Sequence, residues 1–271
     1  MLKSGMYTVG LMMVTLLLLV GCGEYEKILK SRDYPVKYEK AIEYYNDEEY
    51  VKSATLLDQV ANIYRGTTKA DTVKYYQAMS YYGQRDYILA GHYFNELATT
   101  YANSVYLEEA EFMTAFCYYQ MSPRPSLDQE ATYKAINALR MYIAKYPSSD
   151  KVPEAQELIA ELSDKLVEKS YNSAKLYYDL GYYRSAILAL RNSLEEYPDT
   201  QYREELLYLI LKSSYLLADN SVESKKKERL QYTVDEYLSF KSEFPESKYD
   251  KEAERMYRNT QETLESYTTN N

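Results

Sequence analysis

The stretch Ala174–Tyr202, AKLYYDLGYYRSAILALRNSLEEYPDTQY, reads as two short helices joined by a tight turn. Gly181 supplies the turn, because glycine enters left-handed backbone conformations without a steric clash at Cβ. Spacings of three and four residues place one set of second-helix side chains on a common face, namely Tyr183, Ala186, Leu190 and Ser193. Pro198 ends the second helix, since proline lacks the N–H group that the next helical hydrogen bond needs.

Small residues at Ala174 and Ala186 predict a close approach of these two helices, with Tyr177 and Leu190 filling the space beside them. Small, aromatic and large residues at these spacings, with a proline at the end, are typical of a tetratricopeptide (TPR) unit. We therefore expect a helical hairpin that buries its small residues at the crossing point.

The same spacing recurs along the chain. Two upstream copies consist of Ala41, Tyr44, Tyr50, Ser53, Leu57 and Val60, and of Ala78, Tyr81, Tyr87, Ala90, Phe94 and Leu97. A further copy has Ala115 and Tyr118, then, after an insertion around Ser122–Pro125, Thr132, Ala135, Leu139, Tyr142 and Pro147. A fifth runs from about Leu206 to Pro245, with an insertion around Asp219–Lys227 and a first-helix register that is open by one residue. The sequence predicts an all-α, TPR-like α-solenoid of about five helix pairs, and an irregular helical bundle is the alternative.

The ends of the second helices share a motif, found at Tyr101–Tyr106, Tyr146–Ser149, Tyr197–Tyr202 and Phe244–Tyr249. An acidic residue follows each copy, at Glu109, Glu154, Glu205 and Glu252. We interpret the motif as a helix stop followed by a Ser or Thr N-cap. The acid would then lie in the first turn of the next helix, where it suits the helix dipole.

Composition argues against several classes of function. The formal net charge of −9, or −10 without a leader that contains Lys3, argues against nucleic acid as a partner. His92 is the only histidine, which excludes a histidine-based triad or a multi-histidine metal site within one chain. The acidic clusters Asp47–Glu49 and Glu108–Glu109 fit turn and capping positions better than paired catalytic carboxylates. We predict no catalytic residue, no metal site and no enzyme activity.

Residues 1–21 have the features of a signal peptide, with a positive start and an apolar run of about ten residues at Leu11–Val20. The run ends in Leu19-Val20-Gly21-Cys22, which resembles a bacterial lipobox. This resemblance implies cleavage before Cys22 and attachment of diacylglycerol and an N-acyl chain such as palmitate, which together anchor a protein firmly. We expect no other cofactor. Gly23, in place of the Asp that retains enteric lipoproteins in the inner membrane, favours the outer membrane. The alternative is an ordinary secretory leader with an incidental cysteine.

The rest of the chain divides into a lipidated tether (22–33), three N-terminal repeats (34–150), a C-terminal region (151–267) and a disordered tail (268–271). The C-terminal region would hold the last two repeats, preceded by one long helix over Val152–Leu180. If Cys22 is acylated, Cys117 has no disulfide partner and is expected to be a small buried thiol. The run Lys225–Lys227 is either a solvated face or a contact for an acidic partner or lipid head groups.

Aromatic residues occupy two positions of the first helix in each of four repeats. The fifth positions are Tyr38, Tyr75, Phe112 and Tyr171, and the twelfth positions are Tyr45, Tyr82, Tyr119 and Tyr178. They lie seven residues apart on one helix face, so they form either inter-repeat packing or a groove for a peptide with aromatic side chains. In the second case we expect Tyr38, Tyr45, Tyr75 and Tyr82 to form the peptide-recognition end.

A lipobox followed by five TPR-like helix pairs resembles the BamD family, lipoproteins of the outer-membrane β-barrel assembly (BAM) complex. The segment Lys165–Tyr202 and the insertion after Tyr119 carry the likeness most clearly, whereas Ser53 and Gly66 depart from the TPR pattern. The resemblance implies a location on the periplasmic face of the outer membrane. It also implies binding to the POTRA domains of a BamA-type Omp85 barrel through the C-terminal repeats.

The same resemblance implies that the N-terminal repeats recognise targeting peptides of unfolded outer-membrane β-barrel substrates, and that other Bam lipoproteins are possible partners. The alternative is another TPR lipoprotein, such as a secretin or pilus pilotin or a cell-wall-linked adaptor.

Overall fold

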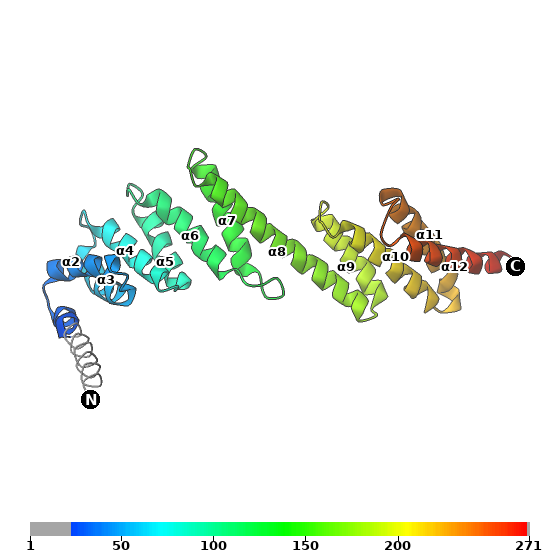
Figure 1. The fold of residues 1–271 in the computed structure, drawn as a ribbon, viewed down its shortest axis with the longest axis horizontal. Coiled ribbons are helices and arrows are strands. Elements are labelled where there is room, and N and C mark those ends of the chain that lie inside the picture. The colour runs from blue at the N-terminus through cyan, green and yellow to red at the C-terminus, as the bar shows by residue number, and fades with distance from the viewer. Residues whose placement is uncertain (1–22, 270–271) are drawn as a thin grey trace, which may run out of the picture. The chain divides into compact units, whose positions relative to one another are not determined.

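The computed structural model describes residues 23–269, and every regular element within that range is a helix (Figure 1). The labelled helices are α2 (Tyr34–Asn46), α3 (Tyr50–Tyr64), α4 (Ala70–Gly83), α5 (Tyr87–Thr100), α6 (Leu107–Met121), α7 (Glu130–Lys145), α8 (Val152–Asp179), α9 (Tyr183–Glu196), α10 (Arg203–Asp219), α11 (Glu223–Glu243) and α12 (Asp250–Thr269). Helices that are consecutive from α2 to α7, and again from α9 to α12, pack on one another. The chain is therefore an all-α, TPR-like array of helical hairpins, as the sequence predicted.

The residues that mark the repeat are buried at the helix crossings. In the first helices, Ala41, Ala78, Ala115 and Ala174 are at most 3% exposed. Their second-helix counterparts Ser53, Ala90, Ala135 and Ala186 are completely buried. Leu211, which is also completely buried, takes this place in α10 and fixes the register that the sequence left open. Small side chains thus let paired helices approach closely, and burial of the surrounding Leu and Phe residues stabilises each pair.

The chain forms two compact units. The first runs to Pro123 and resumes over Gln129–Leu162, and the second comprises Arg124–Asp128 and the chain from Ser163 onward. Their border lies inside α8, a single helix of 28 residues, rather than at residues 150 and 151. Its second half begins the fourth hairpin, because Ala174 joins a buried cluster with Ala186, Leu190 and Leu206.

Tyr177 differs from the expectation, since it remains 44% exposed instead of filling the space beside Ala174. Its second-repeat counterpart, Tyr81, stacks on Tyr93 with 5.3 Å between ring centroids, and its hydroxyl donates to Asp58 at 2.7 Å. The fourth repeat has Ala189 where the second has Tyr93. Tyr177 therefore has no ring at that position on which to stack.

The helix starts also differ in detail from the expected Ser or Thr N-caps. The N-cap residues of α6 and α10 are Tyr106 and Tyr202, and neither makes a side-chain capping bond. Ser104 and Thr200 lie two residues earlier, where their hydroxyl oxygens accept from the Tyr106 and Tyr202 N–H groups at 3.1 and 3.2 Å. These hydroxyls therefore shape the turn before the helix rather than cap the helix itself.

The two predicted insertions have different structures. The first forms a loop between α6 and α7, because Pro123 and Pro125 interrupt any helix there. The second contains no proline or glycine, and most of it extends α11, which begins at Glu223 and is 21 residues long. Only residues 220–222 connect α10 to α11.

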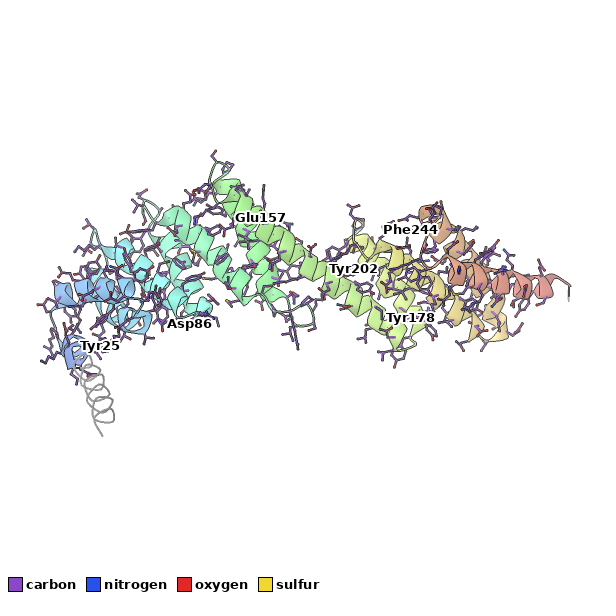
Figure 2. The ribbon with its side chains drawn as sticks, in the orientation of Figure 1. Tyr25, Asp86, Glu157, Tyr178, Tyr202 and Phe244 are labelled. Atoms are coloured by element: carbon purple, nitrogen blue, oxygen red, sulfur yellow. The ribbon has the colours of Figure 1, made fainter. Side chains whose placement is uncertain are left out.

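The predicted tether is helical over residues 23–30, and it packs on the first hairpin (Figure 2, near Tyr25). Ile28 is buried against this hairpin, and Lys37 in α2 donates from Nζ to the Leu29 carbonyl oxygen at 3.0 Å. At the other end, α12 continues to Thr269, two residues into the expected tail. The predicted signal peptide and Cys22 lie outside the described residues. No helix in the described range has the length and apolar character that crossing a membrane requires.

Candidate functional site

The fifth-position aromatic rings are covered by the residue that precedes the first helix of the next repeat. Tyr75 stacks on Tyr106 and Tyr171 on Tyr202, each with ring centroids 4.2 Å apart (Figure 2 labels Tyr202). In the other two repeats a lysine takes this place. Lys69 Nζ lies 4.7 Å from the Tyr38 ring centroid, and Lys151 Nζ lies 4.6 Å from that of Phe112. One face of each fifth-position ring is therefore used in packing between repeats.

A carboxylate lies beside two of the fifth-position tyrosines, Glu109 beside the Tyr75 phenol and Glu205 beside the Tyr171 phenol. Burial first, and then these carboxylates, raise the pKa of both phenols far above the ordinary value of 10.0. The glutamates of the repeated motif therefore bind the preceding repeat, besides lying in the first turn of their own helix.

The fifth repeat contains the same pair of contacts, which the open register had hidden. Tyr208 stacks on Tyr249 with centroids 4.0 Å apart, and burial and then the neighbouring Glu252 carboxylate raise its pKa to about 12. Tyr215 is the matching twelfth-position residue. The sequence does contain the signal. Tyr208, Tyr249 and Glu252 correspond to Tyr171, Tyr202 and Glu205 once the insertion between α10 and α11 is left out.

The twelfth-position rings pack on the start of the second helix, and those of the first two repeats also pack on the next repeat, Tyr45 on Tyr76 at 5.0 Å and Tyr82 on Phe116 at 6.3 Å. Tyr45 contacts Tyr50, Tyr82 contacts Tyr87 and Tyr178 contacts Tyr183, with centroid distances of 5.8, 5.6 and 6.2 Å. Tyr119 instead packs on Phe116 at 5.5 Å, and its hydroxyl donates to Glu161 at 2.7 Å.

Of the eight aromatic residues, only Phe112 is buried, at 3% exposure, and the other seven are half-buried. Within the described part of the chain, no hydrogen-bond acceptor contributes to the pKa of the Tyr45 or the Tyr82 phenol, so both hydroxyl groups are available as donors. Burial raises the pKa of both phenols, so they are neutral hydrogen-bond donors at physiological pH. Tyr45 and Tyr82 thus combine partly exposed rings with unused donors.

The two units differ in the residue between the fifth and twelfth positions. At the ninth position the first unit has Ile42, Met79 and Phe116, and the second has Lys175 and Lys212. Lys212 forms an ion pair with Glu252 at 3.0 Å and lies 5.9 Å from the Tyr178 ring centroid. The aromatic row is therefore apolar in the first unit and cationic in the second, where Tyr171 and Tyr178 lie.

The other sequence-derived candidates have structural roles. Cys117 is completely buried, and Gly91 approaches it so closely that a Cβ there would lie 3.2 Å from the Cys117 Cβ. His92 lies on the exposed side of α5, with Nε2 4.0 Å from Glu96 Oε2. Among the described residues, no group of three His, Cys, Asp or Glu side chains is placed to hold a metal ion.

A separate hollow of about 690 Å³ lies among α5, α6 and α7. Its lining includes Ala98, Thr114, Met141 and the ion pair Lys145–Glu111, but none of the eight aromatic residues. Sequence reasoning missed this hollow, because its walls come from two second helices, α5 and α7, and from the first helix α6 that packs on both, an arrangement that the pattern within a single repeat does not contain.

Comparison with known proteins adds the family. A family model described as YfiO, outer membrane lipoprotein, matches residues 32–230. A comparison with curated proteins gives no match. Among solved structures, the chain is similar to the TPR2AB domain of yeast Sti1 in a complex with pHSP90, with 11% identity, 84% of this chain and 98% of that chain covered, and a TM-score of 0.38. That structural likeness is too low to support an argument about ligands. The family match, in contrast, spans most of the chain, which therefore belongs to the YfiO family of outer membrane lipoproteins.

Proposed function

We propose that this protein is a non-catalytic scaffold and substrate receptor in the assembly of outer-membrane β-barrel proteins. Its first unit binds targeting peptides of unfolded barrels. Its C-terminal repeats bind the POTRA domains of a BamA-type Omp85 barrel. Acyl chains on Cys22 anchor it to the periplasmic face of the outer membrane. Membership of an outer membrane lipoprotein family and a TPR-like array of hairpins support this proposal.

The pair Tyr45 and Tyr82 is the observation on which the receptor role rests. Both rings are half-buried, neither hydroxyl has a hydrogen-bond acceptor among the causes of its pKa shift within the described chain, and apolar residues, Ile42 and Met79, occupy the ninth positions of the same two helices. An aromatic side chain at the end of a peptide would gain apolar contact with these rings, and its carboxylate would accept from a phenol. Aromatic anchors of this kind commonly dominate the binding energy of an interface.

Tyr38 and Tyr75 take a different part in the proposed site. Lys69 covers the Tyr38 ring and Tyr106 covers the Tyr75 ring, so these two offer only their remaining faces. We propose that Tyr38 and Tyr75 pack consecutive repeats together. This packing sets the distance between Tyr45 and Tyr82 so that both can contact one ligand. Tyr38→Ser and Tyr75→Ser should therefore reduce stability as well as affinity.

Peptide titration tests the receptor role. The ligand is a synthetic peptide with the last ten or so residues of an outer-membrane barrel, ending in phenylalanine. The double variant Tyr45→Ser with Tyr82→Ser should bind at least tenfold more weakly, with unchanged helicity. The control is Tyr133→Ser with Tyr232→Ser, which removes two exposed tyrosines from second helices. Equal affinity of the double variant and the unsubstituted chain would refute the peptide site.

Capture of the chain from detergent-solubilised envelopes tests the complex. Co-purification of an Omp85-type barrel is the expected result, and a secretin in its place would identify a pilotin instead. A Cys22→Ser variant should leave the membrane fraction without detergent, because it carries no acyl chain.

A further inference from the structure

The turn between α8 and α9 has the same backbone conformation as the turns between α2 and α3 and between α4 and α5, but its side chains are apolar instead of charged or polar. The middle residues Glu48, Arg85 and Gly181 all have positive φ, at 60°, 60° and 77°. The residue after each donates its N–H to the carbonyl five positions back, at 2.8, 3.0 and 2.9 Å. The first two turns are Asp47-Glu48-Glu49 and Gln84-Arg85-Asp86, whereas the third is Leu180-Gly181-Tyr182. Turn geometry therefore does not explain the apolar residues of the third.

These apolar residues are open to solvent. Leu180 is 58% exposed and Tyr182 is 61% exposed, and Leu176, one turn earlier in α8, is 54% exposed. The same three positions of the second repeat are occupied by Gln84, Asp86 and buried Ser80. An exposed group of Leu and Tyr side chains in one turn indicates a contact surface.

The turn between α10 and α11 lies at the same edge of the second unit, because α9 reverses the direction of α8 and α10 reverses it again (Figure 1). Val222 in this turn is 69% exposed, and Lys225, Lys226 and Lys227 follow it at the start of α11. Lys225 forms a long contact of 3.6 Å with Glu228, while Lys226 and Lys227 form no ion pair within the described chain.

The charge of this edge is opposite to that of the whole protein. The two turns and their flanks carry six basic residues, Lys175, Arg184, Lys225, Lys226, Lys227 and Arg229, and four acidic residues, Asp179, Asp219, Glu223 and Glu228. The chain as a whole has a net charge of −9. An anionic surface is therefore attracted here although most of the molecule repels it.

We propose that this edge, which we name the turn edge and define by Leu176, Leu180, Tyr182, Val222 and Lys225–Lys227, docks on the anionic surface of a lipid bilayer. Leucine and tyrosine side chains enter the boundary between head groups and acyl chains, and lysines remain at the level of lipid phosphates. The family supplies the setting, because an outer membrane lipoprotein works beside a bilayer. Acyl chains on Cys22 would make this second contact intramolecular, so a contact that is weak by itself would still be occupied.

Vesicle binding tests the proposal without the acyl chains. The mature-length chain with Cys22→Ser is sedimented with vesicles of phosphatidylglycerol and phosphatidylcholine, and with vesicles of phosphatidylcholine alone, at low and physiological salt. We expect binding to the anionic vesicles that weakens with salt and is at least tenfold weaker on the neutral ones. Hydrogen exchange on anionic vesicles should slow in the amides of residues 180–186 and 220–227, but not in the matching turns at 47–49 and 84–86.

Two variants and a matched control locate the contact. Leu180→Ser with Tyr182→Ser should weaken binding to anionic vesicles by about tenfold. Lys225→Gln, Lys226→Gln and Lys227→Gln together should weaken it at least as much. The control triple Lys30→Gln, Lys134→Gln and Lys251→Gln changes the net charge equally at other exposed sites and should bind as before.

Three outcomes would overturn the proposal: no binding to anionic vesicles, equal binding by all variants, or loss of a captured envelope protein by the turn-edge variants with vesicle binding unchanged. The last outcome would assign the edge to a protein partner. The peptide titration of Tyr45 and Tyr82 concerns the other unit, so failure of either proposal leaves the other standing.

Discussion

Burial decides the chemistry of Cys117, the cysteine that the described chain contains. Its side chain is completely buried, and burial raises the pKa of the thiol from an ordinary value of 9.0 to about 12. Since the thiolate is the reactive form, a buried neutral thiol is inert. The residue therefore acts as a small apolar group beside Gly91, as the sequence predicted.

This burial gives a prediction about reactivity. In a chain with Cys22→Ser, Cys117 is the sole cysteine, and at pH 8 it should react with a thiol reagent only when the protein unfolds. The measurement is the labelling rate in buffer and in guanidinium chloride. Rapid labelling of the folded chain at pH 8 would show that the thiol is accessible.

The same shift couples stability to pH. Between about pH 9 and pH 12 the unfolded chain releases the thiol proton that the folded chain keeps, so the free energy of unfolding falls as pH rises. Several tyrosines with raised pKa also lower the free energy of unfolding as pH rises. The contribution of Cys117 is therefore the difference in the free energy of unfolding between the unsubstituted chain and Cys117→Ala, measured at each pH. A difference that does not change across this range would contradict the buried neutral thiol.

Hairpin turns show how one backbone geometry accepts different residues at different cost. At φ of 77°, Gly181 has no Cβ to clash, whereas Arg85 adopts φ of 60° with a side chain. Gly181→Ala should lower the free energy of unfolding by about 1 kcal/mol, and Arg85→Gly should raise it by about 0.5 kcal/mol. Urea denaturation measures both, and a lower midpoint for Arg85→Gly, or an unchanged midpoint for Gly181→Ala, would refute the strain argument.

Gly83 has a packing role instead. A Cβ at this position would lie 2.5 Å from Cγ of the Tyr50 ring, so α4 approaches the start of α3 too closely for any side chain. Gly83→Ala should destabilise the protein by about 1–3 kcal/mol. Asp179→Ala, at the same repeat position but exposed, should change stability by less than about 0.5 kcal/mol, and an equal loss in both variants would remove the packing explanation.

The helical hairpins were predictable because their signal is local. Ala174, Ala186 and Leu190 lie within one hairpin, and their spacing alone places them on facing sides. The role of Tyr177 depended on a partner in the next helix, where Ala189 replaces a tyrosine, so spacing alone gave the wrong answer. From the sequence the two insertions were interpreted alike, and the helical structure of the second, which lacks the prolines of the first, was not predicted.

The candidate site was predictable only as a set of positions. Periodicity placed the eight aromatic residues on one helix face, and it left packing and ligand binding as alternatives. Tyr75 stacks on Tyr106 and lies beside the Glu109 carboxylate, both more than 30 positions away in the sequence, so these contacts depend on how one repeat packs against the next. The exposed fraction of each ring depends on this packing between repeats, and the pattern within a single repeat does not determine it.

At the scale of the whole molecule, α8 belongs to both compact units. Its first part, with buried Ala155 and Leu162, falls in the first unit, and its second part, with Ala174, falls in the second. Repeat arrays are stabilised mainly by contacts between neighbours, so a defect should spread locally rather than through the entire chain. We therefore expect the border inside α8 to be visible in local opening.

Leu57 and Leu211 provide matched probes, because each is completely buried in the core of one unit. Leu57→Ala and Leu211→Ala should each cost about 2–5 kcal/mol. Leu211→Ala should speed hydrogen exchange in α9–α11 and in residues 163–179, and leave α3–α5 unchanged, while Leu57→Ala should do the reverse. Uniform acceleration in both variants would mean that the units unfold as one. Separate opening would let a partner bound to the second unit stabilise it while the first remains free to exchange its peptides.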